Sequence, residues 1–234
     1  MPEASPRDVP AVLARLPLFT QVGGDLLAVL ASSSTSRTLP RGEVVFSRGQ
    51  ECRGFFVVLR GQVKLSLTSA DGNEKVLEII GAGESFAEGV MFADRPYPVT
   101  ATALAPTVVL AIPRQAVLDL IDADPTFARR MLAGMSMRLH AMVADVAAMS
   151  LHSARQRVAG YLVGEVTGPD AALPAGPAQV RLPAGKAVLA SRLSLTPETF
   201  SRVLRLLADD GLISVDGHEV QVLDVAGLAA SSGE

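Results

Sequence analysis

The sequence has few of the residues that build disulfides, metal centres and enzyme active sites. Its 234 residues include one cysteine, Cys52, three histidines and no tryptophan. One cysteine cannot form a disulfide within the chain, and it cannot supply an iron–sulfur cluster or a cysteine-rich zinc site. A cupin-like metal enzyme is an alternative of a different class, but it needs two or three ligands within 40–112, where there is no histidine. We therefore expect a protein that is not an enzyme.

Charge is also sparse. Charged residues make up 19% of the chain, hydrophobic residues 49%, and the net charge is −3, which argues against disorder and gives no overall basic excess. The longest uncharged stretch, 96–113, approaches the length of a membrane span. Its prolines and β-branched residues predict two short strands instead. With no signal peptide in the first ten residues, we expect a cytoplasmic protein without a membrane partner.

Short apolar runs separated by glycine turns occupy the chain from Leu39 to about Pro113. Runs at roughly 8–12-residue spacing are typical of a β-sandwich or barrel. The clearest runs are 44–46, 55–59, 63–67 and 76–80.

A helical pattern follows from Arg114 to beyond Ser150 and contains apolar residues at alternating spacings of three and four. This spacing forms the a/d seam of a coiled coil and predicts a homodimer. The alternative is a single helix packed against its own domain. The seam consists of Leu132, Met135, Leu139, Met142, Val146 and Met149.

The C-terminal part predicts a winged helix-turn-helix. Two helices, 184–190 and 197–210, are followed by two short strands around Asp216-Gly217, a strong hairpin signal. Thr196 can cap the second helix and Pro197 suits its first position.

The second of these helices is the candidate DNA-reading element. Arginine commonly reads guanine and glutamate can accept from cytosine N4, and both occur in its first two turns. The stretch from Arg181 to Arg205 has five basic residues and one acidic residue, a local charge of +4. Alternatives are a solvated helix face and a scaffold module that never touches DNA. The predicted DNA contacts are Glu198, Thr199, Ser201, Arg202, Arg205, Arg192 and Lys186.

The chain resembles the Crp/Fnr superfamily of bacterial transcription regulators over essentially its full length. Residues 41–49, 56–65 and 86–88 are similar to its cyclic-nucleotide-binding-type β-roll. The resemblance implies an α+β fold with three parts: an effector domain with an N-terminal helical arm (1–125), a dimerisation helix (126–152) and a winged helix-turn-helix (153–234).

The Glu-x-x-Ser-Arg motif of Glu198, Ser201 and Arg202 is similar to the Fnr-side recognition motif. The resemblance implies that these residues read TTGAT- or TTGAC-like half-sites, with RNA polymerase as a partner. Residues 74–78, 86–92 and 197–202 are similar to the Dnr branch, whose members respond to nitric oxide through haem and control denitrification.

The sequence departs from the family at the expected phosphate anchor. In the family, an Arg-Ser pair binds the phosphate of the cyclic nucleotide, and these two positions align with Tyr97 and Pro98 here. We therefore expect no cyclic AMP site, although the family's glutamate is retained as Glu88. Another nucleotide or an organic metabolite is an alternative effector. The expected effector pocket contains Phe86, Glu88, Met91, Phe92, Tyr97, Met135 and Leu139.

The sequence also lacks the family's sensor ligands. The N-terminal cysteine group of Fnr proteins is absent, which excludes that iron–sulfur cluster, and Arg192 occupies a position where a haem histidine would be expected. His140 or His152 remains as a candidate haem ligand. An alternative is that Cys52, beside Arg53, acts as a redox or nitrosylation sensor.

Overall fold

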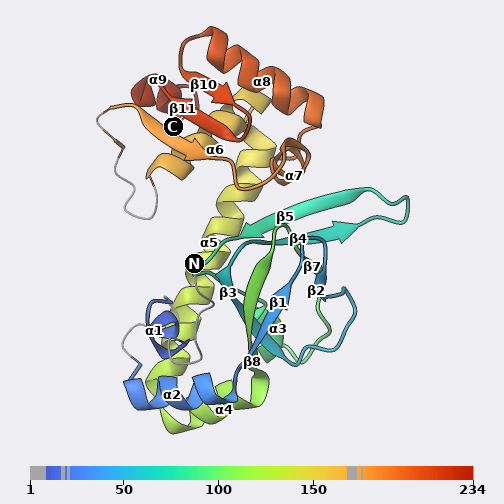
Figure 1. Cartoon of the computed structure of the whole chain (residues 1–234), viewed down its shortest axis with the longest axis vertical. Helices are drawn as coiled ribbons and strands as arrows, with labels where there is room; N and C mark the ends of the chain where they lie inside the picture. Colours follow the sequence, from blue (N-terminus) through green and yellow to red (C-terminus); the bar gives the residue numbers. More distant parts are fainter. Residues whose placement is uncertain (1–8, 17–18, 20–21, 168–172, 175, 234) are drawn as a thin grey trace. The chain divides into compact units, whose positions relative to one another are not determined.

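A computed structural model describes residues 9–16, 19, 22–167, 173–174 and 176–233, with ten side chains of the long helix α5 left out. The chain divides into two compact units, 1–141 and 142–234 (Figure 1). No helix within the described ranges is long and apolar enough to cross a membrane.

The first unit is built around two four-stranded antiparallel sheets (Figure 1). The predicted strands are present, but the first begins at Thr35 rather than Leu39, because it pairs along its whole length with β8. One sheet has the order β1 (Thr35–Leu39), β8 (Thr107–Pro113), β3 (Gly54–Arg60), β6 (Ser85–Phe86). The other has the order β2 (Val44–Phe46), β7 (Thr100–Ala103), β4 (Val63–Thr68), β5 (Glu74–Ile80).

Strand β3 explains why the run 55–59 is apolar without alternation. Phe56 and Val58 point into a cluster to which both sheets contribute, whereas Phe55 and Val57 point into a second cluster under the helices. Side chains of a strand alternate between faces, so a strand buried on both faces is apolar throughout. The helices that cover the second cluster are α1 (Val9–Ala14), α2 (Gly24–Ser33), α4 (Arg114–Ala123) and the start of α5 (Pro125–Leu151).

The short helix α3 (Glu88–Phe92) lies between β6 and β7 in the chain. Ala87, directly before it, has φ +74°, a left-handed conformation that a non-glycine residue rarely adopts. Gly89 lies close to α5, since a Cβ added there would be 3.6 Å from Cε of Met135. Helix α3 was not predicted from the sequence.

The second unit has the predicted winged helix-turn-helix. Its elements in chain order are α6 (Ala154–Thr167), β9 (Ala178–Arg181), α7 (Lys186–Arg192), α8 (Pro197–Asp209), β10 (Ile213–Asp216), β11 (Glu219–Val222) and α9 (Val225–Ala230). Helix α7 begins two residues later than predicted, and α9 was not predicted. The hairpin β10–β11 turns through Gly217 at φ +58°, and β9 adds a third antiparallel strand.

Candidate nucleic-acid interface

Helix α8 begins with the predicted cap. Thr196 Oγ1 accepts a hydrogen bond from the Thr199 backbone N–H at 3.2 Å, and Pro197 occupies the first helical position. The Thr196 hydroxyl also lies 3.1 Å from Thr199 Oγ1. These contacts fix the first turn, which is the turn that a recognition helix presents to bases.

The two faces of α8 separate as the sequence predicted. Phe200, Val203, Leu204 and Leu207 are buried in the core of the unit. On the opposite side, Glu198, Arg202 and Arg205 are exposed, and Thr199 and Ser201 are half-buried. The predicted base-reading residues therefore share the solvent side of one helix.

Glu198 lies in the first turn of α8. Its own backbone N–H and the Thr196 side chain hold the pKa of its carboxyl below the ordinary value. A carboxylate is favoured at this end of a helix, where backbone N–H groups are unpaired. Glu198 is thus maintained as a hydrogen-bond acceptor at the exposed tip of the helix.

The remaining basic residues of this region differ in their surroundings. Lys186, the first residue of α7, is exposed. Arg192, the last residue of α7, is half-buried. Burial raises the pKa of the Tyr161 phenol of α6, and the positive charge of Arg192 opposes this shift. Arg181 lies 3.5 Å from Glu219 of β11, so part of the local positive charge is compensated by a residue distant in sequence.

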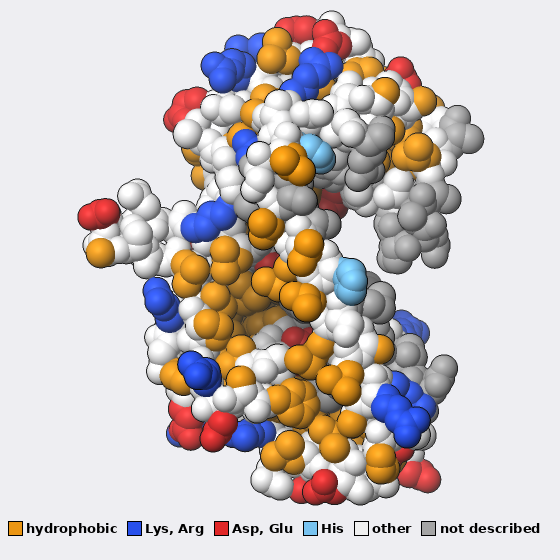
Figure 2. Space-filling view, turned by 180° about the vertical axis from the view of Figure 1, so that it is seen from behind, with side chains coloured by type: hydrophobic (Ala, Val, Ile, Leu, Met, Phe, Trp, Pro, Cys, Tyr) orange, Lys and Arg blue, Asp and Glu red, His pale blue; other side chains and the backbone are white. Residues whose placement is uncertain are grey.

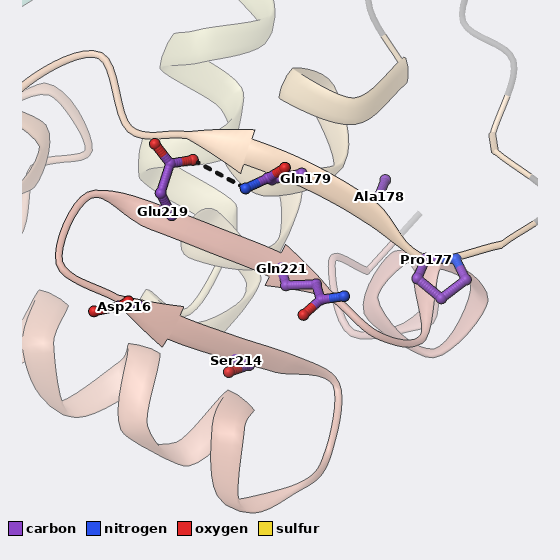
Figure 3. A pocket seen from close by; sticks show the side chains of 7 residues that line it. All are labelled: Pro177, Ala178, Gln179, Ser214, Asp216, Glu219 and Gln221. Carbon is purple, nitrogen blue, oxygen red and sulfur yellow. Dashed lines mark hydrogen bonds between the residues drawn. The ribbon is translucent and has the colours of Figure 1, made fainter.

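The outer face of the wing sheet is polar. A cavity of about 520 Å³ lies on this face. Figure 3 shows its lining side chains, among which Gln179 Nε2 donates to Glu219 Oε2; these atoms are 3.3 Å apart. No predicted DNA contact lines this cavity. Its lining residues are Pro177, Ala178, Gln179, Ser214, Asp216, Glu219 and Gln221.

The predicted seam lies on α5 and is largely exposed within one chain. Leu132, Leu139, Met142 and Val146 are between 59% and 63% exposed, and Met135 is half-buried. The side chain of Met149 lies outside the described residues. Hydrophobic side chains also gather over the face of the first unit in the lower half of Figure 2. Large exposed apolar patches mark sites of association.

The predicted effector residues differ in their surroundings. Phe86 and Tyr97 lie in the cluster between the sheets, whereas Met91 belongs to the cluster under the helices. Phe92 and Leu139 are 38% and 61% exposed. Glu88 is buried at the start of α3.

Tyr97 is part of an aromatic cluster that fills the space between the sheets. Its ring stacks on Phe46, and Phe56 and Phe86 stack with centroids 5.3 Å apart. The Tyr97 hydroxyl donates to the Gly54 carbonyl at 2.9 Å. A bulky apolar side chain with an internal partner therefore occupies the position where the family's basic anchor was expected.

The candidate sensor side chains differ in their surroundings. His140 is exposed, and its Nδ1 lies 2.8 Å from the Ser136 carbonyl oxygen. His152 is half-buried just after α5. Cys52 is half-buried near Tyr97 and borders a cavity of about 260 Å³ with Arg95 and Arg114. Within the described ranges, no three histidine, cysteine or acidic side chains form a metal-binding group.

Comparisons with known proteins match both units. A cyclic nucleotide-binding domain matches residues 36–124 and a Crp-like helix-turn-helix domain matches residues 156–231. The cyclic AMP receptor protein of Thermus thermophilus is 29% identical over 211 residues, covering 90% of this chain and 94% of that protein. The transcriptional activator protein Anr of Pseudomonas aeruginosa is 29% identical over 240 residues, covering 100% of this chain and 94% of that protein.

The solved structure of DNR from Pseudomonas aeruginosa is similar over the full length. It is 31% identical, covers 99% of both chains and has a TM-score of 0.52. The fold, the helix-turn-helix and these relatives agree with the family expected from the recognition motif. The chain belongs to the Crp/Fnr family and is a DNA-binding transcription regulator rather than an enzyme.

Proposed function

We propose that the protein is an effector-controlled homodimer that reads palindromic DNA with TTGAT- or TTGAC-like half-sites. The observation that carries the proposal is the capped first turn of α8, which presents Glu198 and Arg202 on the exposed side of a helix with a buried opposite face. A major groove admits such a helix with its N-terminal residues at the base edges.

The side chains have distinct proposed roles. Arg202 donates to a guanine, the ionised Glu198 accepts from a cytosine amine, and Ser201 contacts a neighbouring base. Thr199, Arg205 and Lys186 contact the phosphate backbone, which sets register and orientation.

The homodimer follows from the seam on α5. Exposed Leu132, Leu139, Met142 and Val146 would be covered by the same residues of a second copy. Two copies of α8 would then meet half-sites about 34–36 Å apart, one turn of DNA. A DNA-bound dimer acts on transcription in the cytoplasm by contacting RNA polymerase, as in other members of the family.

The proposed effector is nitric oxide or a related redox signal, sensed through haem as in the Dnr branch. His140 is exposed and its Nδ1 lies 2.8 Å from the Ser136 carbonyl oxygen, an arrangement in which a histidine can bind a metal through Nε2. A bound haem would supply the iron that takes up nitric oxide; His140 or His152 would hold it. A small metabolite in the β-roll is the alternative effector.

Cyclic AMP is not the proposed effector. A phosphate needs a cation, and Tyr97 at the expected anchor is 3% exposed, with its hydroxyl bonded to Gly54. Titration with a fluorescent cyclic AMP analogue should therefore give no saturable signal. Saturable binding at micromolar concentration would contradict this part of the proposal.

Gel shift with a TTGAT-N4-ATCAA duplex tests the DNA-reading function. Arg202→Ala and Glu198→Ala should each weaken binding by at least about fivefold, since a good base contact contributes about 1–3 kcal/mol. Asp216→Ala on the outer wing face is the control and should bind normally. Equal retention of the duplex by all four proteins would defeat the proposal.

Visible absorption of protein purified with haem tests the effector. We expect a Soret band that shifts with nitric oxide and is lost in His140→Ala or His152→Ala, with the exposed His218→Ala as the control. If the wild-type protein takes up no haem, the small-metabolite alternative is favoured.

A further inference from the structure

The short helix α9 packs beside the helix through which the chain enters the DNA-binding motif. Val225 and Leu228 of α9 are buried, and α9 contacts α6, which also contacts the recognition helix α8. Apolar packing of this kind stabilises the unit but is non-directional. Directional contacts are found at both ends of α9, and each end meets a different part of the motif.

The start of α9 is joined to the end of α8. Leu212 follows α8 in the chain, and its backbone N–H donates to the Leu207 carbonyl of that helix at 3.1 Å. The Leu212 carbonyl accepts hydrogen bonds from the backbone N–H groups of Leu223 and Asp224 at 2.9 and 3.3 Å. Asp224 is the N-cap of α9, and its Oδ1 accepts from the Gly227 N–H at 2.9 Å. Leu212 therefore connects the recognition helix to the cap of α9.

Gly227 shows how closely these two parts approach. A Cβ added at this position would lie 2.4 Å from Asp224 Oδ2 and 2.8 Å from Leu212 Cδ2. A residue without a side chain allows this close approach. The first turn of α9 is thus fitted against the residue that follows the recognition helix.

The end of α9 is joined to the start of α6. Helix α6 begins with a capping box, in which the Ser153 N–H donates to Gln156 Oε1 at 2.9 Å and the Gln156 N–H donates to Ser153 Oγ at 3.3 Å. Ser232 is 3% exposed, and its Cβ would lie 3.7 Å from a Cβ at Gly160. Gly233 has φ +87°, and a Cβ there would lie 2.3 Å from Gln156 Nε2. The residues after α9 thus lie against the side chain that caps α6.

We propose that α9 and residues 231–233 form a brace that holds the recognition helix α8 in a fixed orientation relative to the start of α6, with Asp224 and Gly233 as positioning residues. This inference rests on the proposed DNA-reading function. Base contacts need side chains at set positions, whereas sequence-independent binding depends on charge. A loosened brace should therefore reduce sequence preference more than it reduces affinity for DNA in general.

Two substitutions of Asp224 test the end of the brace near α8. Asp224→Ala removes the cap of α9, whereas Asp224→Asn keeps a capping oxygen and removes the same charge. Gel shifts compare the TTGAT-N4-ATCAA duplex with a duplex of scrambled half-sites, at a temperature at which circular dichroism shows every variant folded. Asp224→Ala should bind the first duplex roughly fivefold more weakly, the factor for a lost cap of about 1 kcal/mol, and the scrambled duplex normally. Asp224→Asn should bind both duplexes as the wild type does.

Three outcomes of this comparison would overturn the proposal. Equal losses of Asp224→Ala on both duplexes, or no loss on either, would show that the cap contributes only to stability. Equal losses for Asp224→Ala and Asp224→Asn would show that the charge matters and the cap does not.

Gly233→Ala tests the end of the brace near α6. It should also lower sequence preference, because alanine is strained at positive φ and the added Cβ displaces the Gln156 side chain. Gly164→Ala, at a position on α6 with no atom within 4 Å of the added Cβ, is the control and should bind normally. Gly233→Ala should lower Tm less in a Gln156→Ala protein than in the wild type, because the disturbed contact is already absent. Equal Tm losses in the two proteins would refute this contact.

Hydrogen exchange of the free protein separates the brace from the DNA-reading function. Asp224→Ala should speed exchange of the Leu212 amide and of the last turn of α8, and Asp224→Asn should not. Unchanged exchange at Leu212 in Asp224→Ala would refute the brace whatever the protein does with DNA. Faster exchange there, in a protein whose wild type shows no preference for the TTGAT-N4-ATCAA duplex, would retain the brace and refute the DNA-reading function.

Discussion

Tyr97 lies against Phe46 with ring centroids 3.7 Å apart and ring planes inclined by 15°. Its hydroxyl donates to the Gly54 carbonyl, so a residue between two sheets is fixed by both ring and hydroxyl. Aromatic pairs add to the stability that burial already provides. The interior of this β-roll is therefore built partly from a side chain that replaces the expected cation.

Substitution of Tyr97 should separate these two contributions. We expect Tyr97→Ala to lower the free energy of unfolding by about 3–5 kcal/mol and Tyr97→Phe by about 1 kcal/mol. Urea unfolding measures both, with Phe92→Ala at a 38% exposed position as the mild control. Equal losses for the two Tyr97 variants would show that ring packing does not contribute as described.

The tyrosines should titrate only when the protein unfolds. The chain has two tyrosines and no tryptophan, and burial raises the pKa of both Tyr97 and Tyr161 above the ordinary value near 10. The folded state thus holds these protons more tightly than the unfolded state. The contribution of these two phenols to the free energy of unfolding is therefore fully present below about pH 10 and declines at higher pH.

Absorbance at the tyrosinate band provides the measurement. Native protein at pH values just above 10 should show little tyrosinate, and addition of denaturant at the same pH should release the signal of both residues. A native protein that ionises either phenol near pH 10 would contradict the burial described for it.

Gly61 should be far less replaceable than Gly42. Both have positive φ, +83° and +87°, but a Cβ at Gly61 would lie 2.5 Å from Thr107 Oγ1 and 2.6 Å from the Pro106 carbonyl oxygen. Nothing lies within 4 Å of a Cβ at Gly42. Gly42→Ala should lower the free energy of unfolding by about 1–2 kcal/mol, because alanine is strained at positive φ. Gly61→Ala should lower it by about 1–3 kcal/mol more, because the added Cβ also overlaps its neighbours. Chemical denaturation measures both losses, and equal losses for the two variants would contradict the close contact of Gly61 with Pro106 and Thr107.

Ser194→Gly should stabilise the second unit. Ser194 has φ +55°, which costs about 1–2 kcal/mol for a residue with a Cβ. Ser194→Ala, which keeps the Cβ and removes the hydroxyl, is the matched control. We expect the glycine variant to unfold at a higher Tm than the alanine variant; the reverse order would exclude strain at this turn.

Leu139→Asp should dissociate the proposed dimer without unfolding the chain. Leu139 is 61% exposed in one copy, so a charge there costs little until a second copy buries it. Ala133→Asp, at an exposed position outside the seam, is the control. Sedimentation equilibrium should give a monomer for the first variant and a dimer for the second. A dimeric Leu139→Asp protein would place the interface elsewhere.

The sequence predicts the second unit well because its signals are local. The Thr196 cap, the Asp216-Gly217 hairpin and the apolar positions of α8 each depend on residues close in sequence. The structure adds what depends on distant residues. Arg181 lies 3.5 Å from Glu219, a contact for which the spacing of residues carries no signal.

The first unit illustrates the same difference. Apolar runs indicate strands, but the pairing of β2 with β7 and of β3 with β8 joins segments about fifty residues apart. Phe86 at the end of β6 and Met91 in α3 belong to different core clusters, and this depends on the assembled sheets and helices rather than on the local sequence.

The pairing of β1 with β8 has a practical consequence. Thr35 lies opposite Ala111 at one end of this pair, so the chain enters and leaves the β-roll at neighbouring strands. Domains whose ends lie close together tolerate circular permutation and insertion into other proteins. A segment meant for insertion into the surface loop of a reporter protein should therefore run from α2 to α4, residues 24–123, because these two helices flank β1 and β8 in the chain, contact each other and cover Phe55 and Val57.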